Sequence, residues 1–236
     1  MLTLTAHQPQ YLPGLRLFDK IARADMFVYL DTVPMESSGF ENRNKIKTAK
    51  GWQWLTVPVL RKDYQTRPID TIKIKGQQWV DKHWKSIKLA YKKAPFWDWL
   101  VEDTELFYFL EPPPCYTNEL ALLNYAILIE LVEILGIEIK LDSATNHNFV
   151  GNKSDLILDM CKKLGATKYI FGAKGRGYAK VEDFEREGIE VEFQDYQHPV
   201  YPQLHGEFLP NMSVVDLLMN CGPKSLEVLT CGNLKK

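Results

Sequence analysis

The first 30 residues constrain the fold more than any other part of the chain. Leu2–Ala6 alternates in polarity as a short strand does, and it leads into the segment HQPQYLPG at 7–14, whose two prolines exclude a continuous helix or strand. Apolar residues then recur at helical spacing over 15–22, and Met26–Leu30 is a nearly continuous apolar run. This order predicts a βαβ unit with parallel strands. Because α/β sheets bind ligands at the carboxyl ends of their strands, the loop beginning at His7 is a candidate site.

The rest of the chain alternates between strand and helix patterns. Alternating or short apolar runs predict strands over 52–60, 69–74, 137–141, 169–171 and 189–193. Helical spacing predicts helices over 80–93, 96–110, 119–135, 154–164, 181–187 and 214–220. The alternation indicates an α/β fold with a mainly parallel sheet flanked by helices. We expect one domain over 1–236, with room for a helical subregion at 80–135.

Composition excludes several classes of protein. No segment approaches the roughly 18 consecutive apolar residues of a membrane span. The N-terminus lacks the basic segment and long apolar stretch of a secretory signal, so we expect a cytoplasmic protein. No His, Asp or Glu spacing indicates a metal site, and no motif identifies a cofactor. The cysteines are dispersed and none forms a CxxC pair, which disfavours zinc and favours buried or incidental thiols: Cys115, Cys161, Cys221 and Cys231.

The net charge of −1 conceals a strongly basic segment. Residues 43–93 contain 14 Lys and Arg and only three acidic residues, a balance of +11 that the rest of the chain offsets with −12. Such asymmetry indicates a site for phosphate or another anion, or a solvated basic face. The interleaved aromatic residues also suit a nucleotide or nucleic acid: Trp52, Trp54, Trp79, Trp84 and Tyr91.

Two short motifs offer donors for an anion. The first is Arg43-Asn44-Lys45-Ile46-Lys47, in which Arg provides a planar fork and Lys a flexible point charge, although a solvated loop would look similar. The second is the glycine-rich segment Gly172–Tyr178 after a predicted strand, where backbone N–H groups could approach an anion beside Lys174 and Arg176. Its spacing matches neither GxGxxG nor a Walker loop, and a plain strand-to-helix turn is the alternative.

Histidines mark two further candidates. His7 could bind phosphate or act as an acid or base, or simply stabilise its turn. His198 and Gln203 lie in the loop YQHPVYPQ, where polar side chains around prolines make a poor core. Ser213 and Asp216 follow, and they could complete a Ser–His–Asp set or act as the cap and first-turn acid of the last helix. No GxSxG motif supports a serine nucleophile.

These blocks, in this order, resemble the WbqC-like family. The resemblance covers nearly the whole chain, through HQPQYLP at 7–13, NRNKIKT at 42–48, HPVYPQLHGEF at 198–208 and LPNMSVVDLLMNCGP at 209–223. It implies a role in bacterial clusters for O-antigen, other surface polysaccharides or specialised metabolites. The implied activity is transfer of an aminoacyl group, glycine in particular, onto an amino sugar. The family's pattern falls on His7, Gln8, Gln10, Tyr11, Pro13, Arg43, Asn44, Lys47, His198, Tyr201, Gln203, Pro210, Ser213 and Asp216.

Our first hypothesis is a transferase that joins an acyl or aminoacyl group from an anionic, phosphate-bearing donor to an amine acceptor. His7, His198 and Asp216 are the expected catalytic residues. The expected substrate-binding residues are Gln8, Gln10, Tyr11, Arg43, Asn44, Lys45, Lys47, Lys174, Tyr178, Tyr201, Gln203 and Ser213. The alternatives are an ATP-dependent adenylating or nucleotidyl-transferring enzyme and a non-catalytic protein that binds a phosphate ligand or RNA, tRNA included.

Overall fold

A computed structural model describes residues 1–36, 38–60, 62–108 and 117–230. The predicted end of a helix at Leu110, together with Cys115 and Cys231, lies outside the described residues. Among the residues described, no helix is long and apolar enough to cross a membrane.

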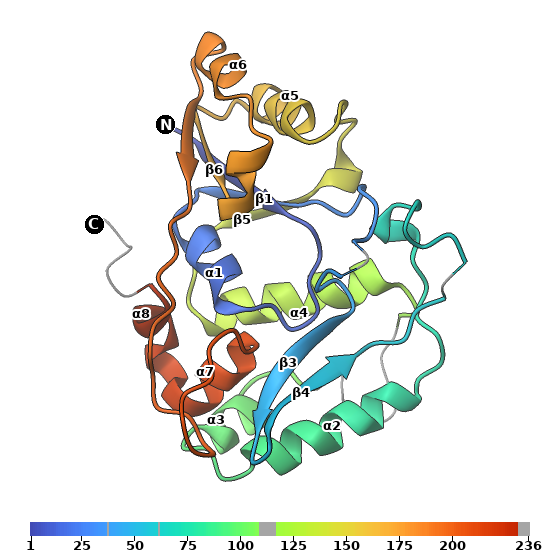
Figure 1. The fold of residues 1–236 in the computed structure, drawn as a ribbon, viewed down its shortest axis with the longest axis vertical. Helices are drawn as coiled ribbons and strands as arrows, with labels where there is room; N and C mark the ends of the chain where they lie inside the picture. Colours follow the sequence, from blue (N-terminus) through green and yellow to red (C-terminus); the bar gives the residue numbers. More distant parts are fainter. Residues whose placement is uncertain (37, 61, 109–116, 231–236) are drawn as a thin grey trace.

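A five-stranded parallel sheet forms one layer of the structure (Figure 1). Its strands are β1 (Thr3–His7), β2 (Met26–Tyr29), β5 (Lys140–Ser143), β6 (Lys168–Phe171) and β7 (Glu190–Phe193). They lie in the order β5-β2-β1-β6-β7, and every neighbouring pair is parallel. The predicted α/β class and the βαβ start are therefore confirmed.

Helices cover both faces of this sheet, because side chains alternate along each strand. Phe27 and Tyr29 contribute to a buried cluster with α1 (Leu15–Ala22) and α4 (Leu120–Ile134). Met26 and Val28 point to the opposite face and contribute to a second cluster. The helices of that second face are α5 (Ser154–Leu164) and α6 (Val181–Arg186), at the top of Figure 1.

A two-stranded antiparallel hairpin lies apart from the main sheet, between the sheet layer and α2 (Figure 1). It consists of β3 (Arg43–Thr48) and β4 (Gly51–Thr56), and α2 spans Gln78–Tyr91. The remaining helices are α3 (Trp97–Glu102), α7 (Val214–Cys221) and α8 (Ser225–Leu229). Ile46 and Leu55 are buried on the side of the hairpin that packs with the α2 helix, and the other side, apart from the buried Lys47, lies toward the surface.

Three local predictions were wrong. The predicted strand over Ile69–Ile74 is a 3-10 turn at Ile69–Thr71, because the carbonyl of Pro68 accepts the N–H of Thr71 at 3.0 Å and leaves only isolated bridges beyond. The strand expected over 52–60 ends at Thr56, since Pro58 has no N–H to continue the ladder. The helix expected from 96 to 110 ends at Glu102. Conversely, residues 43–48, for which a loop was one interpretation, form a strand.

Candidate functional site

The order of the strands reverses between β1 and β6. The chain moves from β1 outward to β2 and β5 on one side, then returns through α5 to β6 and β7 on the other. In open parallel sheets, ligands bind at the carboxyl ends of the two strands on either side of such a reversal. His7 is the last residue of β1, and the 3-10 turn Ala173–Gly177 follows the end of β6. Two motifs singled out in the sequence therefore meet at this switch point.

His7 is held as a neutral imidazole. Its Nδ1 lies 2.9 Å from the carbonyl oxygen of Gln8, so Nδ1 carries the proton and Nε2 keeps a basic lone pair. Burial, together with the positive charges of Lys20 and Lys174, lowers the pKa of His7 to about 3, and the hydrogen bond to Gln8 partly opposes this shift. A neutral histidine with an unprotonated Nε2 is the form that a general base requires.

Lys20 is a buried amine whose charge acts on His7. Its side chain comes from α1 and is only 3% exposed, and its Nζ donates to the carbonyl oxygen of Ala6 at 2.8 Å. Burial lowers the pKa of Lys20 to about 7. We refer to His7, Lys20 and Lys174 as the switch-point cluster. Its two amines, whose charges both act on a neutral imidazole, favour a bound anion, because an anion offsets the cost of a buried positive charge.

The glycines of the turn after β6 determine how closely that turn approaches the strand. A Cβ at Gly175 would lie 2.7 Å from the Cβ of Phe171, whereas one at Gly172 would meet nothing within 4 Å. The turn can therefore fold over Phe171 only with glycine at 175. This close approach places the exposed Lys174 where its charge acts on His7.

The loop after β1 divides its polar side chains between surface and core. Gln8 and Gln10 are partly exposed, and Gln8 Nε2 donates to the carbonyl oxygen of Pro34 at 3.2 Å. Tyr11 is fully buried, and its hydroxyl lies 2.9 Å from Nδ1 of His83. Tyr178, which follows the turn after β6, is more exposed than Tyr11. Its ring packs edge-on against that of Phe171, with 6.0 Å between the ring centroids. Burial and the nearby charge of Glu36 raise the pKa of Tyr178.

Asp216 lies at the centre of a second, buried network. Its Oδ1 accepts from the Tyr91 hydroxyl at 2.8 Å, and its Oδ2 accepts from the Tyr201 hydroxyl at 2.9 Å and from Gln203 Nε2 at 2.6 Å. Burial raises the pKa of Asp216, which these hydrogen bonds and Lys47 partly oppose. None of the three donors is a histidine. The carboxylate thus connects α7 to α2 and to the loop that precedes α7.

His198 is engaged at both ring nitrogens. Nδ1 lies 2.8 Å from the carbonyl oxygen of Pro199, and Nε2 accepts the N–H of Asn211 at 3.1 Å. Burial lowers the pKa of His198, so the ring is neutral. Nearby, Ser213 is buried and caps α7 by accepting the N–H of Val215 at 3.2 Å. The structure places both His198 and Ser213 in the segment that precedes α7, and each side chain forms hydrogen bonds with nearby backbone groups.

The basic motif of β3 alternates between core and surface. Asn44 is buried, and its Nδ2 donates to the carbonyl oxygen of Leu12 at 2.7 Å. Lys47 is also buried, and its Nζ donates to the carbonyl oxygen of Glu207 at 2.5 Å. Arg43 and Lys45 are partly exposed beside the tryptophans of β4. The motif is therefore divided between two anchoring side chains and two that reach the surface.

Sequence reasoning missed Lys20 and Tyr91. Lys20 occupies a helix that the apolar spacing identified, and the signal that could have revealed it is a charged residue between Phe18 and Ile21, both fully buried. Tyr91 was noted only as one of several aromatic residues in the basic segment. Its hydroxyl both donates to Asp216 and accepts the N–H of Lys47 at 2.9 Å.

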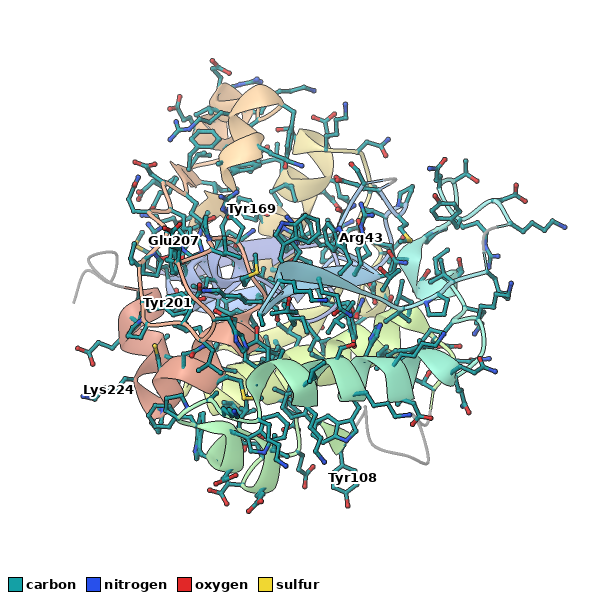
Figure 2. All side chains as sticks on the ribbon, turned by 60° about the horizontal axis from the view of Figure 1, so that its bottom comes forward. Arg43, Tyr108, Tyr169, Tyr201, Glu207 and Lys224 are labelled. Atoms are coloured by element: carbon teal, nitrogen blue, oxygen red, sulfur yellow. The ribbon has the colours of Figure 1, made fainter. Side chains whose placement is uncertain are left out.

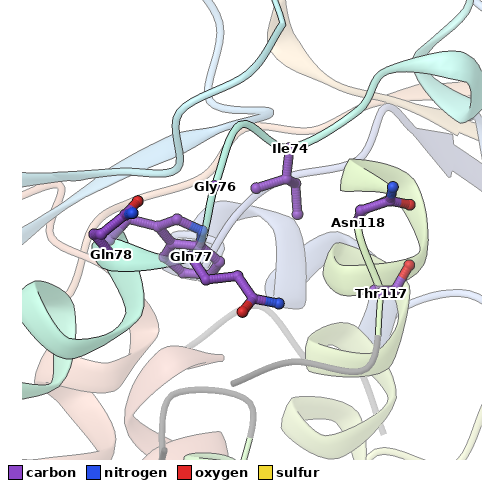
Figure 3. Close-up of a pocket in the computed structure, with 7 residues that line it drawn as sticks. Ile74, Gly76, Gln77, Gln78, Thr117 and Asn118 are labelled. Carbon is purple, nitrogen blue, oxygen red and sulfur yellow. The ribbon is translucent and has the colours of Figure 1, made fainter. Parts of the chain in front are cut away.

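A cavity of about 480 Å³ lies away from both groups of residues (Figure 3). None of the candidate site residues lines it; the lining is Ile74, Gly76, Gln77, Gln78, Trp79, Thr117 and Asn118. Within 1–36, 38–60, 62–108 and 117–230, no group of three or more His, Cys, Asp and Glu side chains is placed to hold a metal ion.

Fold and site together define a doubly wound α/β protein with a cationic cluster at its topological switch point. The model of the WbqC-like protein family matches residues 8–228, and this chain belongs to that family. The chain is also 33% identical over 231 residues to the uncharacterized protein Rv1507c of Mycobacterium tuberculosis (strain ATCC 25618 / H37Rv), covering 94% of this chain and 95% of that protein. No solved structure matches it.

Proposed function

We propose that this WbqC-like protein is a cytoplasmic transferase that moves an acyl or aminoacyl group, glycine in particular, from a phosphate-bearing donor to the amine of an amino sugar or a similar acceptor. The product would enter a surface polysaccharide such as O-antigen or a specialised metabolite. The observation that carries the proposal is the switch-point cluster, where the charges of Lys20 and Lys174 both act on a neutral His7.

The cluster supplies two of the functions that such a transfer needs, namely binding of the donor's phosphate and removal of a proton from the acceptor amine. Lys174 is exposed and binds the donor's phosphate. The acceptor amine attacks the acyl carbon, a C–N bond forms, the bond to the donor breaks, and His7 Nε2 takes the proton from the amine. The donor's negative charge offsets Lys20 and Lys174 and raises the pKa of His7, so donor binding makes His7 a stronger base.

The remaining candidate residues take binding and positioning roles. The acceptor binds to Gln8 and Gln10, which are partly exposed in the loop after His7, and to Tyr178, which is exposed just after the turn that carries Lys174. We assign proton transfer to His7 rather than His198, because both nitrogens of His198 have backbone partners. Asp216 positions Tyr201 and Gln203, and with them the loop before α7.

The test is an assay of product formation. The protein is incubated with amino sugars and with glycine activated as an adenylate, a thioester or a tRNA ester, and the glycyl amide is measured by mass spectrometry. His7→Ala should lower kcat at least 100-fold, as loss of a general base does. Lys174→Gln should raise KM for the donor, and Lys224→Gln, an exposed lysine of the C-terminal region (Figure 2), is the matched control. No product with any donor, or full turnover by His7→Ala, would reject the proposal.

A second candidate is an ATP-dependent adenylating or nucleotidyl-transferring enzyme. The strand order favours it, because nucleotides bind at the switch point of doubly wound sheets of this order. A thermal-shift comparison separates the two. Stabilisation of the wild-type protein by ATP, lost in Lys174→Gln, supports adenylation, whereas stabilisation only by acyl donors supports simple transfer.

A further inference from the structure

The outward face of the β3–β4 hairpin is the second surface with the chemistry of a binding site. Arg43 pairs with Thr56, Lys45 with Trp54 and Lys47 with Trp52, so these six side chains share one face. The opposite face carries the buried Ile46 and Leu55. We call the partly exposed part of the outward face, with Phe40 beside it, the hairpin platform: Phe40, Arg43, Lys45, Trp52 and Trp54.

Cations and aromatic rings are interleaved on this platform. Lys45 Nζ lies 4.6 Å from the ring centroid of Trp52 and 5.1 Å from that of Trp54, and Arg43 Cζ lies 4.7 Å from Trp54. Trp52 meets Trp54 edge-on at 5.8 Å, and Phe40 lies 6.0 Å from Trp54. Trp52 is 50% exposed and Phe40 is 40% exposed. Large aromatic residues so exposed, each in contact with another platform residue, form a patch of the kind that marks an interaction surface.

The charge of the hairpin selects the kind of partner. Residues 43–56 contain four cations and no Asp or Glu. The nearby Glu41 is 2% exposed, so its carboxylate adds little charge at the surface. Lys47 is covered by the carbonyls of Gly206 and Glu207, which leaves Arg43, Lys45 and Lys50 to meet an anion.

We propose that the hairpin platform binds a single-stranded polynucleotide segment, with its phosphates on Arg43 and Lys45 and its bases stacked on Trp52 and Trp54. Every base has a flat face that can stack on an aromatic side chain, and a cationic groove beside such rings follows the backbone. A neutral glycan would use the rings and leave the lysine and arginine unused. A polyanion without bases would use the cations alone. The combination favours single-stranded RNA or DNA, a ligand beyond the small-molecule transfer proposed above.

Fluorescence anisotropy with a labelled single-stranded RNA tests this platform, because its two kinds of contact respond differently to salt. Trp52→Ala should weaken binding about tenfold while leaving the slope of log K against log salt unchanged. Lys45→Gln should weaken binding and reduce that slope by about 0.7, the value for one lost phosphate contact on a single strand. The double variant Lys85→Gln/Lys88→Gln removes two exposed lysines of α2 and should bind as the wild type does.

Several outcomes would overturn the proposal. Equal affinity of Trp52→Ala and the wild type would show that the aromatic residues take no part. Binding of inorganic polyphosphate as tight as that of RNA would indicate a charge-only surface, and quenching of tryptophan fluorescence by neutral oligosaccharides but not by RNA would indicate a glycan site. Thermal unfolding of each variant checks folding, which the exposure of Trp52 and Lys45 predicts to be intact. Because Lys174→Gln leaves the platform unaltered, it should bind RNA normally even if the proposed transfer fails.

Discussion

At the scale of single residues, the function we propose depends on a positive charge that is buried, where the loss of hydration lowers the stability of the protein. Lys20 is buried with a backbone carbonyl as its hydrogen-bond acceptor, and its pKa is lowered to about 7. An isolated buried ammonium destabilises a protein, so retaining one beside His7 is a stability cost that an anionic ligand would offset.

Lys20→Met should therefore stabilise the free protein and weaken its binding of anions. The folded pKa of about 7 lies below the unfolded value, so the cost of the charge is fully present below pH 7 and disappears as the pH rises toward 10.5. We expect a gain in unfolding free energy on the order of 2–3 kcal/mol at pH 6, after loss of the hydrogen bond to Ala6, and a much smaller gain at pH 10. Urea unfolding at both pH values measures it. A loss of stability at pH 6 would mean that the hydrogen bond outweighs the charge.

The neutral histidines give a second dependence on pH. The pKa of His7 is lowered to about 3 and that of His83 to about 4, so between these values and 6.5 the unfolded chain binds more protons than the folded one. Stability should fall as the pH is lowered from 6.5 toward 3. His7→Gln should show a shallower decline than the wild type in urea unfolding at successive pH values. Identical slopes for the two proteins would show that His7 is charged in the fold.

At the scale of elements, the turn after β6 positions Lys174, and glycine at 175 permits that turn. Gly175→Ala would bring a Cβ to 2.7 Å from Phe171, whereas Gly172→Ala would place one in open space. We expect Gly175→Ala to lose about 1–3 kcal/mol of unfolding free energy together with anion affinity. Gly172→Ala is the matched control and should be near neutral in both. Equal effects of the two changes would show that the contact with Phe171 is unimportant.

Elements also show what sequence could and could not predict. The strand over 26–30 followed from a continuous apolar run, because it is buried on both faces of the sheet, and the helix over 154–164 followed from helical spacing, because it buries one apolar face. The segment Ile69–Ile74 alternates equally well, yet hydrogen bonds within the segment and to Pro68 make it a turn. Similarly, the cations of the motif 43–47 are evident from the sequence, but the burial of Asn44 and Lys47 is not. That burial depends on contacts with Leu12 and Glu207, which are far away in sequence.

At the scale of the whole molecule, two buried clusters on opposite faces of one sheet suggest how stability is distributed. β1 and β2 contribute side chains to the core, whereas β5 is an edge strand with a largely polar pattern. Native-state hydrogen exchange should find the slowest amides in β1, β2 and β6 and faster exchange in β5, β7 and the hairpin. Exchange in β1 as fast as in the hairpin would contradict this distribution.

The central claim is that the switch point between β1 and β6 binds an anion and thereby activates His7. It is tested most directly by following the His7 ring nitrogens by NMR across pH, with and without inorganic pyrophosphate. We predict a neutral Nδ1–H ring in the free protein down to about pH 3 and a rise in the pKa of His7 when pyrophosphate is present, an effect that Lys174→Gln diminishes. A His7 pKa that pyrophosphate leaves unchanged, with perturbations at His198 or around Trp79 instead, would contradict it.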